Sequence, residues 1–498
     1  MTKKRKDSEN SMGYPSLLYL TQPALKPMSL SVFEDLQLLH FIPRSVAKTV
    51  RIPCEKDNLL PRQKLFSSLF RHEARVCFAD LYLVAAELKT LHDTYTSARC
   101  DAERYAVFAA LMDADRRFAA QAAESCFGDC LSDRFAMAFA AKCKDTHYRA
   151  MSGALDQLLP DLDELCENAL CTHKETVRMA RGTRSTYLDR IVACAETLGI
   201  DMPKIRQTES RRLSPDILAA AATLRPEIFR RLKTFHETYR GLYDEAVTYY
   251  RKELQFYLVM LDFFDRIRKA GIPLTFPTVC EGRGIAVTEA YDVSLLAKDE
   301  TNIIPNDIAF SDEEPFFFLT GANGGGKTTY LRTVGIAVIL FLCGCPLPCR
   351  AAEIGEISSV FTHFPRDERF DGSGRFVEEN GRVEKILAAM DDRSLVLLNE
   401  TYSTTNEENA VLMTEKLASE LHEKAIFGLY ITHQHTLNEL GIPYLNVLID
   451  RDDANRRTYK IARQKSTDGS FAKDILERLE LTKEALERRF GPLADKEV

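Results

Sequence analysis

The chain has 498 residues, of which 28% are charged and 45% hydrophobic, with no Trp. This length predicts two or three domains, and the balance is that of a soluble globular protein. No apolar run reaches 18 residues, and the basic start at Lys3–Lys6 lacks the apolar stretch of a secretory signal. We therefore expect a cytoplasmic protein with no membrane partner.

The 13 cysteines follow neither a disulfide nor a metal-binding pattern. No Cys-x-x-Cys motif occurs, and Cys343, Cys345 and Cys349 lie in an apolar stretch with no histidine nearby. Such cysteines are typical of reduced, buried thiols. The sequence therefore predicts no structural metal site.

Charge is distributed unevenly along the chain, whose net charge is −7. Residues 173–233 carry 13 Lys/Arg against 7 Asp/Glu, a local charge of +6. Arg178, Arg181 and Arg184 recur at a spacing of three and would share one helix face, where they would meet DNA phosphates. Such contacts position DNA without reading its sequence. The alternative interpretation is a solvated arm with many ion pairs.

Residues 57–272 are predicted to be helical almost throughout. Apolar residues recur at helical spacing from Leu254 to Ile267, and Gly271 ends the run. The pattern extends back to about Pro226, and a helix of about 45 residues would be about 65 Å long. Helices of this length form an arm rather than a compact bundle.

Short apolar runs alternate with helical segments after Pro273. The runs are GIAVTEAYDVSLL, PFFFLTG, SLVLLNE and AIFGLYITH. This alternation predicts an α/β domain with a mainly parallel sheet over residues 273–465. Residues 466–498 contain a charged amphipathic helix or helix pair, which packs against either a partner subunit or this domain. Residues 1–56 form a separate N-terminal segment.

A glycine-rich motif follows the run PFFFLTG. The pattern Gly-x-x-x-x-Gly-Lys-Thr begins at Gly321 and fits the P-loop, with a strand before it and a helix after it. Backbone N–H groups of the loop would hold the phosphates of ATP, Lys327 would reach the β- and γ-phosphates, and Thr328 would bind Mg²⁺. The predicted nucleotide-binding residues are Gly321, Ala322, Asn323, Gly324, Gly325, Gly326, Lys327, Thr328 and Thr329.

Two later apolar strands also end in polar residues. LVLLNE ends at Asn399 and Glu400, and LYITHQ continues into His433. This order after a P-loop is typical of ATPases of the ABC and related classes. Glu400 would orient or deprotonate the attacking water, and His433 would contact the γ-phosphate or that water. Alone, Glu400 would be interpreted as a solvated charge and His433 as a structural histidine.

These motifs resemble those of the MutS family. TGANGGGKTTYLR resembles its P-loop, and GCPLPCRAAEIGEISSVFTHF resembles the stretch that follows the P-loop helix. GSGRFVEENGRVEKIL is similar to its signature segment, which reaches the ATP of a neighbouring subunit. IIPND resembles its pre-loop segment and implies that Asn306 contacts adenine. The resemblance covers about residues 57–465 and implies a multidomain protein, with an all-α core and lever domain before an ABC-class P-loop ATPase domain.

The sequence departs from the family pattern at three places. Asn399 stands where the family has Asp; its amide can bond to a magnesium-bound water but brings no charge, which implies weak metal binding and slow hydrolysis. Gly374 and Arg375 replace the signature Ser-Thr. Gly374 would offer its N–H to the partner's ATP, and Arg375 either supplies charge or is a solvated loop arginine. ETYSTTNEENA replaces the glycine-rich turn that follows the acidic pair.

Only about 55 residues precede the helical region, too few for the family's mismatch-reading and connector domains. We therefore do not expect the usual mismatch wedge. The resemblance implies a homodimeric ATPase that couples ATP-driven closure to binding of double-stranded or branched DNA, in repair or recombination. One alternative is a nucleotide-dependent switch that acts on a protein partner. Another is a mismatch sensor with an unrecognised reading element.

Overall fold

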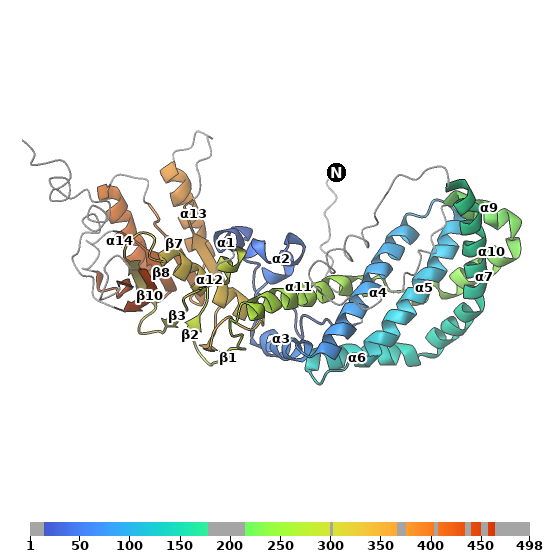
Figure 1. Cartoon of the computed structure of the whole chain (residues 1–498), viewed down its shortest axis with the longest axis horizontal. Helices are drawn as coiled ribbons and strands as arrows, with labels where there is room; N and C mark the ends of the chain where they lie inside the picture. Colours follow the sequence, from blue (N-terminus) through green and yellow to red (C-terminus); the bar gives the residue numbers. More distant parts are fainter. Residues whose placement is uncertain are drawn as a thin grey trace, which may run out of the picture. The chain divides into compact units, whose positions relative to one another are not determined.

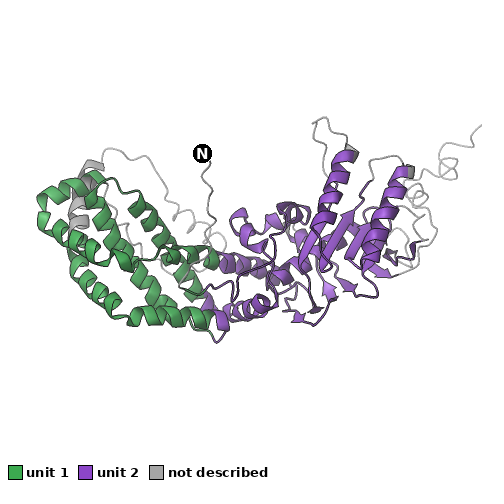
Figure 2. Cartoon of the chain, turned by 180° about the vertical axis from the view of Figure 1, so that it is seen from behind, with its two compact units in different colours: residues 1–15, 76–127, 132–254 green, residues 16–75, 128–131, 255–498 purple. Residues whose placement is uncertain are grey.

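Contacts within the computed structural model divide the chain into two compact units (Figure 2). Unit 1 comprises residues 1–15, 76–127 and 132–254, and unit 2 comprises residues 16–75, 128–131 and 255–498. The domain boundaries inferred from composition stay predictions. The structure describes residues 14–177, 215–298, 302–365, 375–402, 407–433, 440–449 and 457–463.

Some predictions lie outside the described residues. These are the DNA contacts at Arg178, Arg181 and Arg184, the nucleotide contact at Gly374, and the C-terminal helical segment from residue 466. Arg375 is described only as the first residue of a helix.

The predicted helical region is confirmed where the structure describes it. In chain order, its elements are α3 (Lys56–Leu69), α4 (His72–Thr96), α5 (Asp101–Glu124), α6 (Cys130–Lys144), α7 (Thr146–Val177), α9 (Pro215–Leu224), α10 (Pro226–Tyr239), η2 (Arg240–Leu242), η3 (Glu245–Tyr249) and α11 (Tyr250–Lys269). The N-terminal segment before it also contains short helices, α1 (Leu30–Asp35), η1 (Leu38–His40) and α2 (Arg44–Val50).

Aromatic side chains fill the centre of unit 1. Phe118, Phe135 and Phe139 are fully buried. The ring of Phe135 lies 4.8 Å from that of Tyr250 and 4.9 Å from that of Phe139, measured between centroids. Since each ring buries a large apolar area, this cluster accounts for much of the packing between α5, α6 and the start of α11.

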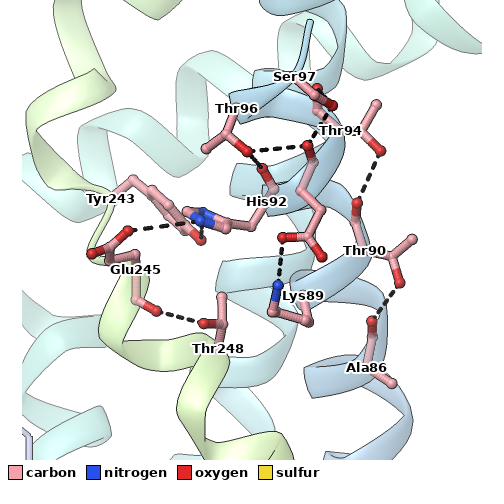
Figure 3. A network of polar contacts seen from close by, with 11 residues as sticks. Ala86, Lys89, Thr90, His92, Thr94, Thr96, Ser97, Tyr243, Glu245 and Thr248 are labelled. Carbon is pink, nitrogen blue, oxygen red and sulfur yellow. Dashed lines mark hydrogen bonds and ion pairs between the residues drawn. The ribbon is translucent and has the colours of Figure 1, made fainter. Parts of the chain in front are cut away.

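The single long helix predicted from Pro226 to Gly271 is wrong, because the chain breaks between α10 and α11. The Asp244 carboxylate accepts a hydrogen bond from the N–H of Ala246 and caps η3. The Tyr243 hydroxyl is hydrogen-bonded to His92 Nδ1 of α4, at 3.1 Å (Figure 3). These side-chain bonds compete with continued helix at the break, although the apolar spacing continues through it.

The predicted α/β region is also confirmed. Its elements are β1 (Thr278–Val279), β2 (Ile285–Ala290), η4 (Val293–Lys298), β3 (Asn306–Phe310), β4 (Phe316–Thr320), α12 (Lys327–Leu342), β5 (Ala351–Ile354), β6 (Ser359–His363), α13 (Arg375–Ala389), β7 (Ser394–Asn399), α14 (Glu407–Glu423), β8 (Phe427–Ile431), β9 (Tyr444–Ile449) and β10 (Arg457–Arg463).

The larger sheet has six strands in the order β10-β9-β4-β8-β7-β6. Its neighbouring strands pair in parallel, except that β10 pairs antiparallel with β9. The smaller sheet has the order β1-β5-β2-β3 and is mixed. The strands β4, β7 and β8 are buried at every residue, as expected for central strands covered on both faces.

Helices cover both faces of the six-stranded sheet. A Cβ added at Gly335 of α12 would lie 2.8 Å from Leu36 and 2.9 Å from Leu397 of β7, so α12 packs closely on one face. Val396 and Leu398 point to the opposite face and join a core with residues of α13 and α14. Figure 1 labels α12, α13 and α14 around this sheet. This alternation follows from the two-residue period of a strand.

Among the helices in the described ranges, none combines the length and the apolar character that crossing a membrane requires.

Candidate active site

Three central strands of the large sheet end side by side. Leu319 of β4 pairs with Ile431 of β8, and Ile431 pairs with Asn399 of β7. Because these strands are parallel, the segments that follow them leave from the same edge. The carboxyl edge of a parallel sheet is where ligands bind in α/β folds. The glycine-rich loop, Glu400 and His433 all begin within two residues of these paired positions.

The glycine-rich loop, residues 321–326, connects β4 to α12 and requires its glycines. Gly321 has φ of 132°, and a Cβ there would lie 2.8 Å from Val447. Gly326 is the N-cap of α12 and has φ of 97°. Residues with a Cβ rarely adopt such backbone angles. The loop therefore turns sharply and directs the N-terminus of α12 toward the edge of the sheet, a geometry that suits an anion.

Lys327 begins α12 and is only 6% exposed. Its Nζ donates to the carbonyl oxygens of Gly321 at 2.8 Å and Ala322 at 3.3 Å, and to Oδ1 of Asn323 at 3.2 Å. Burial lowers the pKa of Lys327, and the negative charge of Glu400 opposes this shift. The ammonium group is thus held inside the loop by oxygen acceptors that a phosphate would replace.

Glu400 lies directly after β7 and bonds to His433, which follows β8. Oε1 of Glu400 is 3.0 Å from Nε2 of His433. This hydrogen bond lowers the pKa of Glu400, against desolvation, and the charge of Lys327 contributes in the same direction. Glu400 is therefore ionised at neutral pH, as a carboxylate that accepts a proton from water must be.

Asn399 is the last residue of β7 and is 9% exposed. Its Oδ1 is buried and has no hydrogen-bond partner among the described residues. A buried acceptor without a partner is costly, so this atom suits a water or a hydrated cation. Thr328, in the first turn of α12, is half-buried. In the part of the chain that the structure describes, no group of three His, Cys, Asp or Glu side chains forms a metal site.

Asn306, the predicted adenine contact, begins β3 and bonds to β10. Its Nδ2 donates to the carbonyl of Tyr459 at 3.0 Å, and its Oδ1 accepts from the N–H of Ile461 at 2.8 Å. Asn306 therefore joins two strands of different sheets. Its contact with adenine stays a prediction.

Three buried residues around Glu400 are not among the residues predicted from the sequence. His363, Tyr402 and Tyr430 are 1%, 2% and 1% exposed and come from different segments. The two tyrosines fit the apolar pattern of the core, so the sequence does not indicate which partners their hydroxyl groups bond to. The only signal that could have indicated His363 is its position at the end of β6, at the same sheet edge.

The fold and this edge define an α/β domain with a glycine-rich loop at the carboxyl edge of its parallel sheet. The sequence profile of MutS domain V matches residues 317–473, which include β4 to β10. A protein named DNA mismatch repair protein MutS from Caldanaerobacter subterraneus subsp. tengcongensis is 30% identical over 248 residues, or 46% of this chain. A protein of the same name from Fervidobacterium nodosum is 33% identical over 152 residues, or 30% of this chain.

A third relative, DNA mismatch repair protein MutS 2 from Halobacterium salinarum, is 32% identical over 161 residues, or 32% of this chain. The chain spans 26%, 18% and 18% of these three relatives, about a fifth to a quarter of their length. The resemblance seen in the motifs is confirmed over the residues that the profile matches, and for the helical half it stays a prediction. Residues 317–473 are similar to MutS domain V.

Proposed function

We propose that this chain is a P-loop ATPase of the ABC class that binds ATP with Mg²⁺, hydrolyses it slowly and couples this cycle to DNA binding. The observation that carries the proposal is the sheet edge where the glycine-rich loop with Lys327, Glu400 and His433 come together. Lys327 and Glu400 affect each other's pKa, and Glu400 bonds to His433. This combination supports the proposal because it would bring a phosphate-binding ammonium and a carboxylate for water to one place.

The chemistry follows from the positions of the charged groups. The Lys327 ammonium would exchange its loop oxygens for phosphate oxygens and stabilise negative charge during transfer. The Glu400 carboxylate would accept a hydrogen bond and then a proton from the attacking water. His433 would keep that carboxylate oriented. Mg²⁺, when bound by Thr328 and through water by Asn399, would supply charge neutralisation at the phosphates.

Asn399→Asp tests the metal part of this site. We expect the Mg²⁺ concentration for half-maximal ATP turnover to fall about tenfold, because a carboxylate adds a negative charge beside the divalent ion. The measurement is ATPase rate against Mg²⁺ concentration. Gln157→Glu, at an exposed position of α7 in unit 1, adds the same charge outside the domain that carries the site and serves as the control. An unchanged midpoint in Asn399→Asp would exclude this position from the metal shell.

The DNA part of the proposal rests on two observations. The relatives are named as DNA mismatch repair proteins, and residues 173–233 carry a local charge of +6 in an acidic chain. We propose that the chain acts as a homodimer on double-stranded or branched DNA. Comparing ATPase rates with duplex, mismatched and branched DNA tests this directly. Stimulation by none of them would favour the alternative, a nucleotide-dependent switch on a protein partner, which the net charge of −7 also favours.

Charge reversal at Arg178, Arg181 and Arg184 tests the basic segment itself. Each phosphate contact contributes about 0.9 to the slope of log K against log salt, so losing three should reduce the slope by about 3. The measurement is DNA affinity at several salt concentrations.

The matched control reverses three exposed charges of unit 2, at Arg44, Arg350 and Lys424. This triple variant changes net charge equally and should leave the salt slope near that of the wild type. Equal salt slopes in the two variants would contradict the proposed contact of Arg178, Arg181 and Arg184 with DNA.

A further inference from the structure

The turn that carries Glu400 has an unusual backbone. The turn comprises residues 400–402. Glu400 has φ of 49° and Tyr402 has φ of 67°, so two of these three residues are left-handed without being glycine. A Cβ makes this conformation unfavourable. Such a turn persists only where the surrounding structure holds it in place.

Hydrogen bonds from two strands fix the centre of the turn. The Thr401 hydroxyl is 3.0 Å from Nδ1 of His363, at the end of β6. The Tyr430 hydroxyl of β8 donates to the carbonyl oxygen of Thr401 at 2.7 Å. The Glu400 N–H donates to the carbonyl of Ile431 at 3.0 Å. The backbone of Glu400 and Thr401 is thus bonded to β8, and the Thr401 side chain is bonded to β6.

Tyr402 fixes the end of the turn. Its ring belongs to the core formed with α13 and α14 and is 2% exposed. Its hydroxyl donates to Oδ1 of Asn380 in α13, at 3.3 Å. Since the ring is enclosed by the core, the backbone of Tyr402 is held in its left-handed conformation by its own side chain.

We propose that His363, Tyr430 and Tyr402 are positioning residues that hold the strained turn so that the Glu400 carboxylate faces the attacking water. The His363 imidazole of β6 and the Tyr430 hydroxyl of β8 bond to Thr401, and the Tyr402 hydroxyl bonds to α13. All three therefore hold the turn of residues 400–402. A carboxylate that acts on water must be placed to within a fraction of an ångström, so loss of one anchor reduces the rate more than the affinity. This inference rests on the proposed role of Glu400 in ATP hydrolysis.

The test compares identical substitutions at two tyrosines of one core. Tyr430→Phe removes the hydroxyl that bonds to Thr401. Tyr444→Phe removes a buried hydroxyl that has no hydrogen-bond partner among the described residues. We expect Tyr430→Phe to lower kcat by about 10- to 100-fold with little change in KM for ATP, and Tyr444→Phe to change neither. Equal kcat in the two variants would overturn the inference.

Thr414→Val separates anchoring from local destabilisation. Thr414 Oγ1 is 3.0 Å from the Tyr430 hydroxyl and is 1% exposed, so its loss perturbs the same core without removing the bond to Thr401. We expect this variant to keep kcat near the wild-type value. A loss as large as that of Tyr430→Phe would mean that core stability alone sets the rate, and would overturn the inference.

His363 allows a rescue experiment. Asn places a polar atom near the position of Nδ1, whereas Leu has similar bulk without one. We expect His363→Leu to lose kcat about tenfold or more and His363→Asn to recover part of it, with the ATP affinity of both near that of the wild type. Identical kcat in these two variants would contradict a role for the bond to Thr401.

Amide hydrogen exchange tests the anchoring without requiring ATPase activity. We expect the peptide containing Glu400 and Thr401 to exchange faster in Tyr430→Phe than in Tyr444→Phe, in the full chain without nucleotide. If the wild-type chain hydrolyses no ATP, the proposed function fails, and faster exchange still supports the anchoring. Unchanged exchange in Tyr430→Phe overturns it whatever the ATPase result.

Discussion

Glu400→Gln is expected to reduce ATP turnover by about 100- to 10,000-fold, the contribution typical of general base catalysis. Gln has the shape of Glu and can still accept the hydrogen bond from His433, but its amide cannot take a proton from water. The Lys327 loop is unchanged, so ATP should still bind. The variant would therefore accumulate bound, unhydrolysed ATP.

The measurement is a single-turnover assay that follows bound ATP and released phosphate separately. Glu423→Gln, at the exposed end of α14, removes the same charge away from the site and should behave like the wild type. If Glu400→Gln hydrolyses ATP at the wild-type rate, Glu400 is not the catalytic carboxylate. If it fails to bind ATP, the substitution has instead disturbed the loop through its charge interaction with Lys327.

The parallel sheet and the edge that carries the candidate site could be predicted because their signals are local. Three of the short apolar runs, which form β4, β7 and β8, occur with a Gly-rich motif in the order that a doubly covered sheet requires. The first run, GIAVTEAYDVSLL, instead contains β2 of the smaller mixed sheet. Parallel pairing then places the ends of β4, β8 and β7 together without further information. The prediction that Glu400 acts on the attacking water, and His433 on that water or on the γ-phosphate, depends on the order of these strand ends after the Gly-rich motif.

Other features could not be predicted because contacts distant in sequence decide them. The break between α10 and α11 depends on a bond from Tyr243 to His92, 151 residues away. The left-handed turn at Glu400 depends on hydroxyl and imidazole groups from β6 and β8. Sequence periodicity indicates which face of an element a side chain occupies, but it does not indicate which group its polar atom bonds to.

Lys327→Met is expected to weaken ATP binding by roughly 10- to 150-fold, since hydrogen bonds to a charged group contribute about 1.5–3 kcal/mol. Met keeps most of the length and the apolar stem of the side chain, so α12 should form as before. The ammonium of Lys327 presently bonds to three loop oxygens in a buried position. Its loss removes the charge that phosphates would meet there.

Thermal unfolding with and without ATP measures this effect. At an ATP concentration of about 100 Kd, the wild type should gain about 2.7 kcal/mol, and a variant with 100-fold weaker binding only about 0.4 kcal/mol. Lys424→Met, at an exposed position that pairs with Glu420, should keep the full gain. An equal gain from ATP in Lys327→Met and the wild type would show that the loop lysine does not bind the phosphates.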